Sequence, residues 1–301
     1  MKKAIIGAVL LMIALLSGCS SSSPNYKIEM TKQLYFLKGH ATAFEIKVTE
    51  NKKAVSDLTI SADVSMANMD HGTETVKLTD EKNGKYSGKV KLPMDGKYEL
   101  TFSMNKDNKK TEKTIDYTVK KAAGVAMING QWIKSEDLQF YQLVNKLQLE
   151  INRENVKKTY TGSQLEDELA YIDSQEKNAK DQNQLLTQII RIRSMALLGE
   201  QRGHQATTDA ITGAIAKDHA QYDQYPAVKS IITSFGEKKF SSLEEKEYKY
   251  TILADQVMAD VTVQAKKDNP NVNDQEVNFQ AQQSYEDLLV SQMNSLKIQI
   301  L

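Results

Sequence analysis

The spacing of apolar residues changes once along this chain, and that change constrains the fold more than any other feature. Before about residue 121, apolar residues alternate with polar ones, as Phe44, Ile46 and Val48 do. A period of two is typical of strands with one buried face. After Ala122-Ala123-Gly124 the apolar residues recur every three or four positions, which is the period of helices. The sequence therefore predicts a multidomain chain, all-β and then all-α.

The first half carries the turn signals of an antiparallel sheet. Asn83-Gly84 and Asp95-Gly96 are dipeptides that favour tight hairpins. Short β-rich runs lie beside them, over residues 85–91, 97–104 and 114–119. About seven short strands without a helical pattern are typical of an immunoglobulin-like β-sandwich. We predict such a sandwich over residues 26–121.

The second half, residues 125–301, carries helix start signals. Ser135 precedes the acidic residues Glu136 and Asp137, so it is a candidate N-cap. Ser163 and Glu166 have the spacing of a capping box, and Ser241-Ser242 precedes another acidic turn. We therefore expect helices to begin at these serines.

Other helix boundaries are as clear. Pro226 is suited to open a short helix, and Asn269-Pro270 is suited to end a long one. The most apolar helix covers residues 185–203, and one more follows Asp274. The tail from residue 296 alternates like a lone strand. The second half is therefore predicted to be mostly helical.

The amino terminus reads as an export signal. Lys2 and Lys3 precede an apolar run, residues 4–16, that is too short to cross a hydrocarbon core of about 30 Å. The run ends in Leu16-Ser17-Gly18-Cys19, which resembles the lipobox of bacterial lipoproteins. That resemblance implies a signal peptide over residues 1–18 and acyl chains on Cys19. The alternative is an ordinary signal peptide followed by an unrelated cysteine.

The expected location is therefore the extracytoplasmic face of the cell membrane, with the chain anchored by lipid. Residues 19–25 are the Ser-rich tether, and the sequence does not distinguish an envelope with one membrane from one with two. The chain has 39 Lys and Arg against 39 Asp and Glu, so no basic field favours a nucleic-acid partner. Cys19 is the single cysteine, which leaves no pair for an intrachain disulfide.

A cluster of soft ligands follows the predicted strand around residue 64. Met66, Met69 and His71 lie within one short segment, and Met94 in a second turn is the reserve. Thioethers suit Cu(I), and imidazole binds copper. Alternatively, Met66 continues the strand alternation into the core and His71 is an ordinary turn residue.

Residues 58–119 resemble the YtkA-like domain, a family related to FixH. The resemblance rests on Met66-Ala67-Asn68-Met69-Asp70-His71-Gly72, Gly84-Lys85-Tyr86 and Leu92-Pro93-Met94-Asp95-Gly96-Lys97-Tyr98-Glu99. The family has a proline near the first methionine, where this chain has Ser65-Met66-Ala67. The resemblance implies a small extracytoplasmic immunoglobulin-like domain with a connection to copper.

The start of the second half resembles the SurA/PrsA chaperone module. The matching run is Ala126-Met127-Ile128-Asn129-Gly130-Gln131-Trp132-Ile133-Lys134-Ser135-Glu136-Asp137-Leu138, and the helix ending near Gly203 follows the family's order. The resemblance implies that the tail, Leu296–Leu301, returns to pair near Met127-Ile128. Many members also carry a parvulin isomerase, but residues 138–301 have no β-periodic block that would encode one.

These observations predict a binding protein and not an enzyme, since no nucleophile–base set, carboxylate pair or phosphate loop is present. The first interpretation is a lipoprotein whose SurA N-terminal-like helical domain holds unfolded or partner envelope proteins, with a copper site in the sandwich. The helical domain could instead grip one folded partner, or serve as a spacer. The alternative is a copper-handling lipoprotein for an envelope cuproenzyme, with the helical half as its docking arm.

Overall fold

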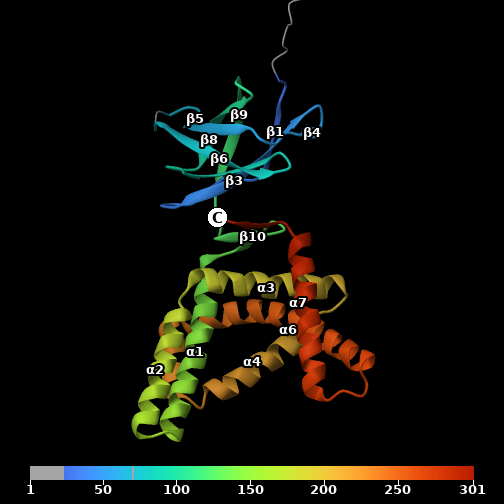
Figure 1. Ribbon diagram of the computed structural model, residues 1–301. Helices are drawn as coiled ribbons and strands as arrows, with labels where there is room; N and C mark the ends of the chain where they lie inside the picture. The colour runs from blue at the N-terminus through green and yellow to red at the C-terminus, as the bar shows by residue number, and fades with distance from the viewer. Residues whose placement is uncertain (1–23, 70) are drawn as a thin grey trace, which may run out of the picture. The chain divides into compact units, whose positions relative to one another are not determined.

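The computed structural model describes residues 24–69 and 71–301. The predicted leader, Cys19 and the tether as far as residue 23 lie outside the described residues, as does Asp70. The chain divides into two compact units, one ending at Ala122 and the other covering Ala123–Ile300. Strands make up the first unit and mainly helices the second (Figure 1), which confirms the predicted order of fold classes.

The first unit is a β-sandwich whose two layers share one strand. β6 belongs to both layers, because residues 73–78 pair with β5 whereas residues 79–82 pair with β7. β1, β3 and β7 form one layer, and β5, β8 and β9 the other. This is the predicted immunoglobulin-like arrangement. Its described strands are β1 (Lys27–Lys32), β2 (Tyr35–Phe36), β3 (Ala41–Glu50), β4 (Lys53–Ala54), β5 (Thr59–Met66), β6 (Thr73–Lys82), β7 (Lys85–Lys91), β8 (Gly96–Lys106) and β9 (Lys109–Lys121).

The sandwich core is apolar, with hydrogen bonds from buried side chains such as Tyr86. Phe44, Ile46 and Val48 of β3 are fully buried, as their alternation predicted. The Tyr86 hydroxyl accepts a hydrogen bond from the Leu58 N–H at 3.1 Å and donates one to the Val55 carbonyl at 2.9 Å. Burying each large apolar side chain contributes about 1.5–3 kcal/mol. The sandwich is thus held by its core and this tyrosine.

The two turn dipeptides behave differently. Asn83-Gly84 closes the hairpin between β6 and β7, with φ of 52° and 74°. Asp95-Gly96 makes no hairpin, so that prediction was wrong, because β7 pairs with β3 and β6 and not with β8. The β8–β9 hairpin turns at Asp107-Asn108 instead, with φ of 49° and 63°.

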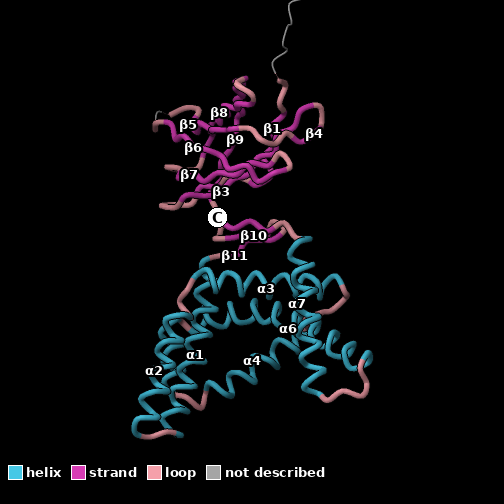
Figure 2. Tube along the Cα trace, viewed as in Figure 1, coloured by secondary structure: helices cyan, strands magenta, loops and turns pink. Residues whose placement is uncertain are grey.

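The second unit is a helical body with a small three-stranded sheet (Figure 2). β12 pairs with β10, so that Met127 lies opposite Gln299, which confirms the predicted returning strand. None of the helices in the described chain is long and apolar enough to span a membrane. The elements are β10 (Ala126–Ile128), β11 (Gln131–Ile133), α1 (Ser135–Thr159), α2 (Gly162–Asn178), α3 (Gln182–Gln201), α4 (Thr208–Tyr222), α5 (Pro226–Phe235), α6 (Glu237–Asp268), α7 (Asp274–Ser295) and β12 (Ile298–Ile300).

Several helix boundaries were predicted correctly. Pro226 opens α5, and α6 ends directly before Asn269-Pro270. The predicted serine caps were wrong. At α1 the cap position is Lys134, whose N–H donates to the Asp137 carboxylate at 2.8 Å. The Asp137 carboxylate thus supplies the reciprocal bond of a capping box, which differs from the bond expected of the Ser135 hydroxyl.

The other two predicted helix starts also differ from the structure. α2 begins one residue before Ser163, at Gly162, and Thr161 caps it without a side-chain hydrogen bond. α6 begins at Glu237, because Gly236 with φ of 102° ends α5 and separates the two helices. Ser241-Ser242 therefore lies inside a helix. α4 was not predicted, since Tyr222 is its one buried residue and its apolar stripe is weak.

A buried charge cluster joins β11, α1, α3 and α6. Arg193 Nη2 lies 2.9 Å from Asp137 Oδ2 and 2.7 Å from Glu247 Oε1. Arg193 Nη1 also donates to the Trp132 carbonyl at 3.3 Å. Lys246 Nζ lies 2.5 Å from Asp137 Oδ1 and 3.4 Å from Glu247 Oε1. Two cations thus balance two carboxylates inside the helical unit.

The pKa values of the two carboxylates shift in opposite directions. Burial raises the pKa of Glu247, and the Arg193 charge offsets only part of that rise. Burial also acts to raise the pKa of Asp137, but the hydrogen bond from Lys246 and the Arg193 charge lower it further, to below its usual value. Asp137 is therefore the carboxylate whose ionised form the fold stabilises.

Candidate functional site

The predicted metal ligands lie at one end of the sandwich, where there is a cavity of about 230 Å³. It is lined by Val64, Met66, His71, Gly72, Glu74, Lys91, Leu92, Pro93 and Tyr98. Two of the four candidates, Met66 and His71, are among these residues. Met69 and Met94 are not, and they are 51% and 37% exposed.

Met66 is the last residue of β5 and lies half-buried against the core. It continues the inward alternation of Ile60, Ala62 and Val64, as the structural alternative supposed. Tyr98 of β8 lies opposite it in the strand register. The terminal methyl of Met66 packs over Gly96, where an added Cβ would lie 3.0 Å from that methyl. Met66 is therefore a core residue that also reaches the cavity.

The segment after β5 turns sharply. The His71 N–H donates to the Met69 carbonyl at 3.2 Å, and Gly72 has φ of 79°. His71 lines the cavity although it is exposed, and Met69 is exposed without lining the cavity. His71 is thus part of a backbone turn, as the alternative interpretation predicted, and it also lines the cavity.

Three further polar residues, Glu74, Lys91 and Tyr98, line the cavity and were not predicted from the sequence. The Tyr98 hydroxyl donates to the Met94 carbonyl at 2.8 Å, which ties the 92–95 turn to β8, and burial raises the pKa of Tyr98. Glu74 also lines the cavity. Its phase with Val76 and Leu78 on β6 was the available signal for an inward position.

The donor set fits a soft metal. A thioether and an imidazole border one cavity, and these ligand types suit Cu(I). Met69 is two residues from His71, which makes it the nearest further sulfur along the chain. Across the described parts of the chain, no three His, Cys, Asp or Glu side chains group as a metal site.

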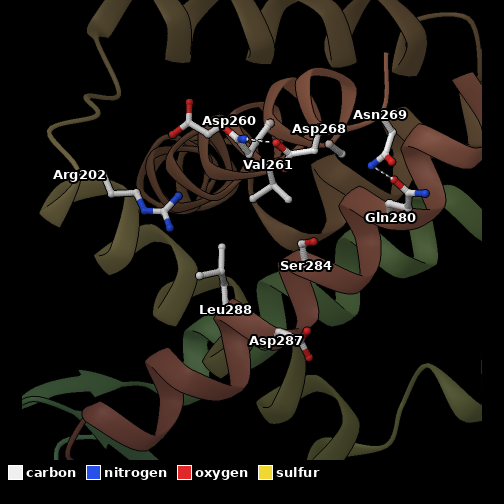
Figure 3. Close-up of a pocket in the computed structure, with 11 residues that line it drawn as sticks. Arg202, Asp260, Val261, Asp268, Asn269, Gln280, Ser284, Asp287 and Leu288 are labelled. Atoms are coloured by element: carbon white, nitrogen blue, oxygen red, sulfur yellow. Dashed lines mark hydrogen bonds between the residues drawn. The ribbon is translucent and has the colours of Figure 1, made fainter. Parts of the chain in front are cut away.

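The helical unit has its own candidate, a groove of about 600 Å³ between α6 and α7. Figure 3 shows Asp260 and Asp268 of α6 across from Ser284 and Asp287 of α7. Arg202, which follows α3, approaches from the side. Asn269 Nδ2 donates to Gln280 Oε1 at 2.7 Å and so bridges the two helices near their connection.

The groove has an apolar floor and a charged rim. Val261 and Ala265 are buried in the core between α3, α6 and α7, and Leu288 packs against that core. On the rim, Asp260 Oδ2 lies 2.7 Å from His204 Nε2, and Asp268 accepts a hydrogen bond from Gln264 at 2.7 Å. Together with Asp287, these give three carboxylates against one guanidinium. The groove therefore suits apolar and cationic groups.

Comparison with known proteins concerns the sandwich. Residues 21–103 match a family model described as YtkA-like. This supports the predicted YtkA-like resemblance over that range, and the match does not extend to the helical unit. The SurA/PrsA-like resemblance and the lipid anchor remain predictions.

A solved structure is also similar to the first unit. It is the solution structure of the fibronectin type-III domain of human fibronectin type III domain containing protein 3. The two share 16% identity over 34% of this chain and 89% of that domain, with a TM-score of 0.23. No curated protein matches the chain in sequence.

Proposed function

We propose that the chain is a copper-handling protein of the cell envelope, held at the extracytoplasmic face of the membrane by lipid on Cys19. The observation that carries the proposal is that Met66 and His71 line one cavity of a YtkA-like domain. A thioether and an imidazole favour Cu(I). The protein binds and passes on the metal, and it catalyses no reaction.

The test is a titration of the purified chain with Cu(I) against a competing chelator. The variant Met66→Leu/Met69→Leu/His71→Ala removes the candidate donors, and Met94→Leu is tested separately as the reserve. We expect the triple variant to bind more than about 100-fold more weakly, because loss of an outer-shell partner alone costs about 10- to 100-fold.

The matched control is Met30→Leu, which makes the same methionine change elsewhere in the sandwich. Met30 is on β1 and is not among the residues that line the cavity. The control is expected to bind as the native chain does. Equal affinity of the triple variant and the native chain would reject the copper site.

The anchor has a separate test. Mass spectrometry of the membrane-bound protein is expected to find an acylated cysteine at the new amino terminus, and Cys19→Ser is expected to release the protein from membranes. Acyl chains add about 0.8 kcal/mol per buried methylene, so two or more chains hold a protein stably. An unmodified Cys19 thiol with the leader still attached would reject the location.

A second candidate function belongs to the helical unit, which we propose holds unfolded or partner envelope proteins. Its support is the groove between α6 and α7, whose size lies in the range of binding pockets and whose floor is apolar. The native chain is expected to suppress aggregation of an unfolded model protein at severalfold excess. If the chain suppresses no aggregation at that ratio, the holding function is rejected. The remaining interpretations of the helical unit are then a docking arm for one folded partner and a spacer.

A further inference from the structure

The groove between α6 and α7 has features that favour one class of protein segment. We propose that it binds an extended segment in which basic side chains alternate with aliphatic ones. The proposal rests on the holding function and specifies its ligand.

The first support is the spacing of polar groups along α6. Asp260, Gln264 and Asp268 line the groove at intervals of four residues. A helix rises about 1.5 Å per residue, so these groups repeat about every 6 Å. An extended chain advances about 6.6 Å over two residues, which is nearly the same distance. Every second residue of an extended segment can therefore meet one polar group of α6.

The opposite wall repeats in a similar way. Gln280, Ser284 and Asp287 of α7 line the groove at intervals of four and three residues. A compact ligand would contact one turn of each helix, whereas a linear segment can contact every turn. The length of both walls favours a linear ligand.

The second support is the separation of apolar and polar surfaces. Val261 and Ala265 at the floor are 7% and 8% exposed, whereas Asp268 and Asp287 on the rim are exposed. Successive side chains of an extended chain point to opposite faces. One set can enter the floor while the other set stays near the rim.

The third support is charge. The rim carries Asp260, Asp268 and Asp287 against the single Arg202. His204 adds a second cation at Asp260 only when protonated. Asp268 receives its hydrogen bond from the neutral amide of Gln264, which leaves its charge in place. Lysine or arginine side chains of a segment therefore complement the rim, and acidic ones are repelled.

The test measures fluorescence anisotropy of labelled peptides with the full chain at low salt. One peptide alternates Lys and Val, a second alternates Glu and Val, and a third has the first composition in two blocks. The variant Asp268→Lys/Asp287→Lys reverses two exposed rim charges. Its control, Glu166→Lys/Asp167→Lys, makes the same change of net charge at exposed positions of α2.

The alternating Lys-Val peptide is expected to bind the native chain best, and to bind the rim variant about tenfold more weakly. Each reversal removes one attraction and adds one repulsion, and a tenfold loss of affinity corresponds to about 1.4 kcal/mol for the two reversals together. The difference should shrink at high salt. The α2 control should bind as the native chain does.

Three results would overturn the proposal: equal binding of the Glu-Val peptide, equal binding of the block peptide, or equal weakening by the α2 control. The aggregation assay separates this failure from that of the holding function. A rim variant that suppresses aggregation as the native chain does would reject the groove and leave holding in place. A native chain that suppresses nothing would reject holding itself.

Discussion

Replacing Asp137 by asparagine removes one charge from the buried cluster and nearly preserves its shape. The amide oxygen can still accept the Lys134 N–H that caps α1. What is lost is the charge facing Arg193, whose side chain is 6% exposed, while the side chain of Asp137 is fully buried. The variant therefore isolates the electrostatic contribution of one carboxylate.

The expected loss of stability follows from the remaining contacts. Removing one partner of a buried ion pair costs about 3–5 kcal/mol, because the other charge stays buried. Arg193 keeps Glu247 at 2.7 Å, and Lys246, which is 37% exposed, can turn toward water. We therefore expect the lower end of that range, about 3 kcal/mol.

Trp132 makes the measurement specific to the helical unit. It is the single tryptophan of the chain, and its carbonyl accepts a hydrogen bond from Arg193. Its fluorescence in urea thus follows unfolding of the second unit and not of the sandwich. With a slope of about 2 kcal/mol per molar urea, a loss of about 3 kcal/mol lowers the midpoint by about 1.5 M.

Asp167→Asn on α2 is the matched control, since that aspartate is exposed and its loss should change stability by less than about 0.5 kcal/mol. Combining Asp137→Asn with Arg193→Met should cost less than the sum of the two single changes, by about 0.5–3 kcal/mol. An Asp137→Asn midpoint equal to that of the control would refute the view that this cluster holds the helical unit together.

Further outcomes follow from particular contacts. The pKa of Asp137 is lowered in the folded state, so its contribution to stability is present above its unfolded value of about 3.9 and is lost as pH falls through the folded pKa. The urea midpoint followed by Trp132 fluorescence should therefore fall more steeply with decreasing pH for the native chain than for Asp137→Asn. Gly199→Ala should destabilise by about 1–3 kcal/mol, because its Cβ would lie 2.8 Å from the Leu253 carbonyl, whereas Gly213→Ala on α4 meets no atom within 4 Å and should stabilise by about 0.5–1 kcal/mol; urea midpoints of both variants decide this. Tyr86→Phe should cost about 1–3 kcal/mol in calorimetry of the sandwich transition, because the Leu58 N–H and the Val55 carbonyl both lose their side-chain partner, and an unchanged transition would contradict that role.

The sequence was informative where one residue's neighbours decide its environment. Phe44, Ile46 and Val48 are buried as their alternation predicts, because a strand with one face on a core repeats every two residues. Asp95-Gly96 misled for a tertiary reason. Strand pairing across the sandwich, and not the local dipeptide, decides which turn becomes a hairpin, and the weaker signal Asp107-Asn108 forms one.

The predicted serine caps were wrong for different local reasons: α1 begins at Ser135 but is capped at Lys134, whereas α2 and α6 begin earlier than predicted. In the sequence, Asp137 indicates only an acidic residue in the first turn of a helix. It is instead fully buried, it caps α1 and it pairs with Arg193 and Lys246. Arg193 and Lys246 lie 56 and 109 residues further along the chain by their numbering, so no local pattern around Asp137 indicates either contact.

The two candidate sites also differ in how far the sequence indicates them. Met66 and His71 lie within one short segment, so their shared cavity could be anticipated from spacing, whereas the position of Met69 outside that cavity could not. The groove could not be anticipated, because its residues come from α6, α7 and the end of α3 and meet only through helix packing. That packing depends on Gly199, where α3 approaches the backbone of α6 at Leu253. Since the same core forms the groove floor, Gly199→Ala should also weaken binding of the Lys-Val peptide, and Gly213→Ala should not. Peptide affinity that is unaffected by Gly199→Ala would separate the groove from the packing of α3 on α6.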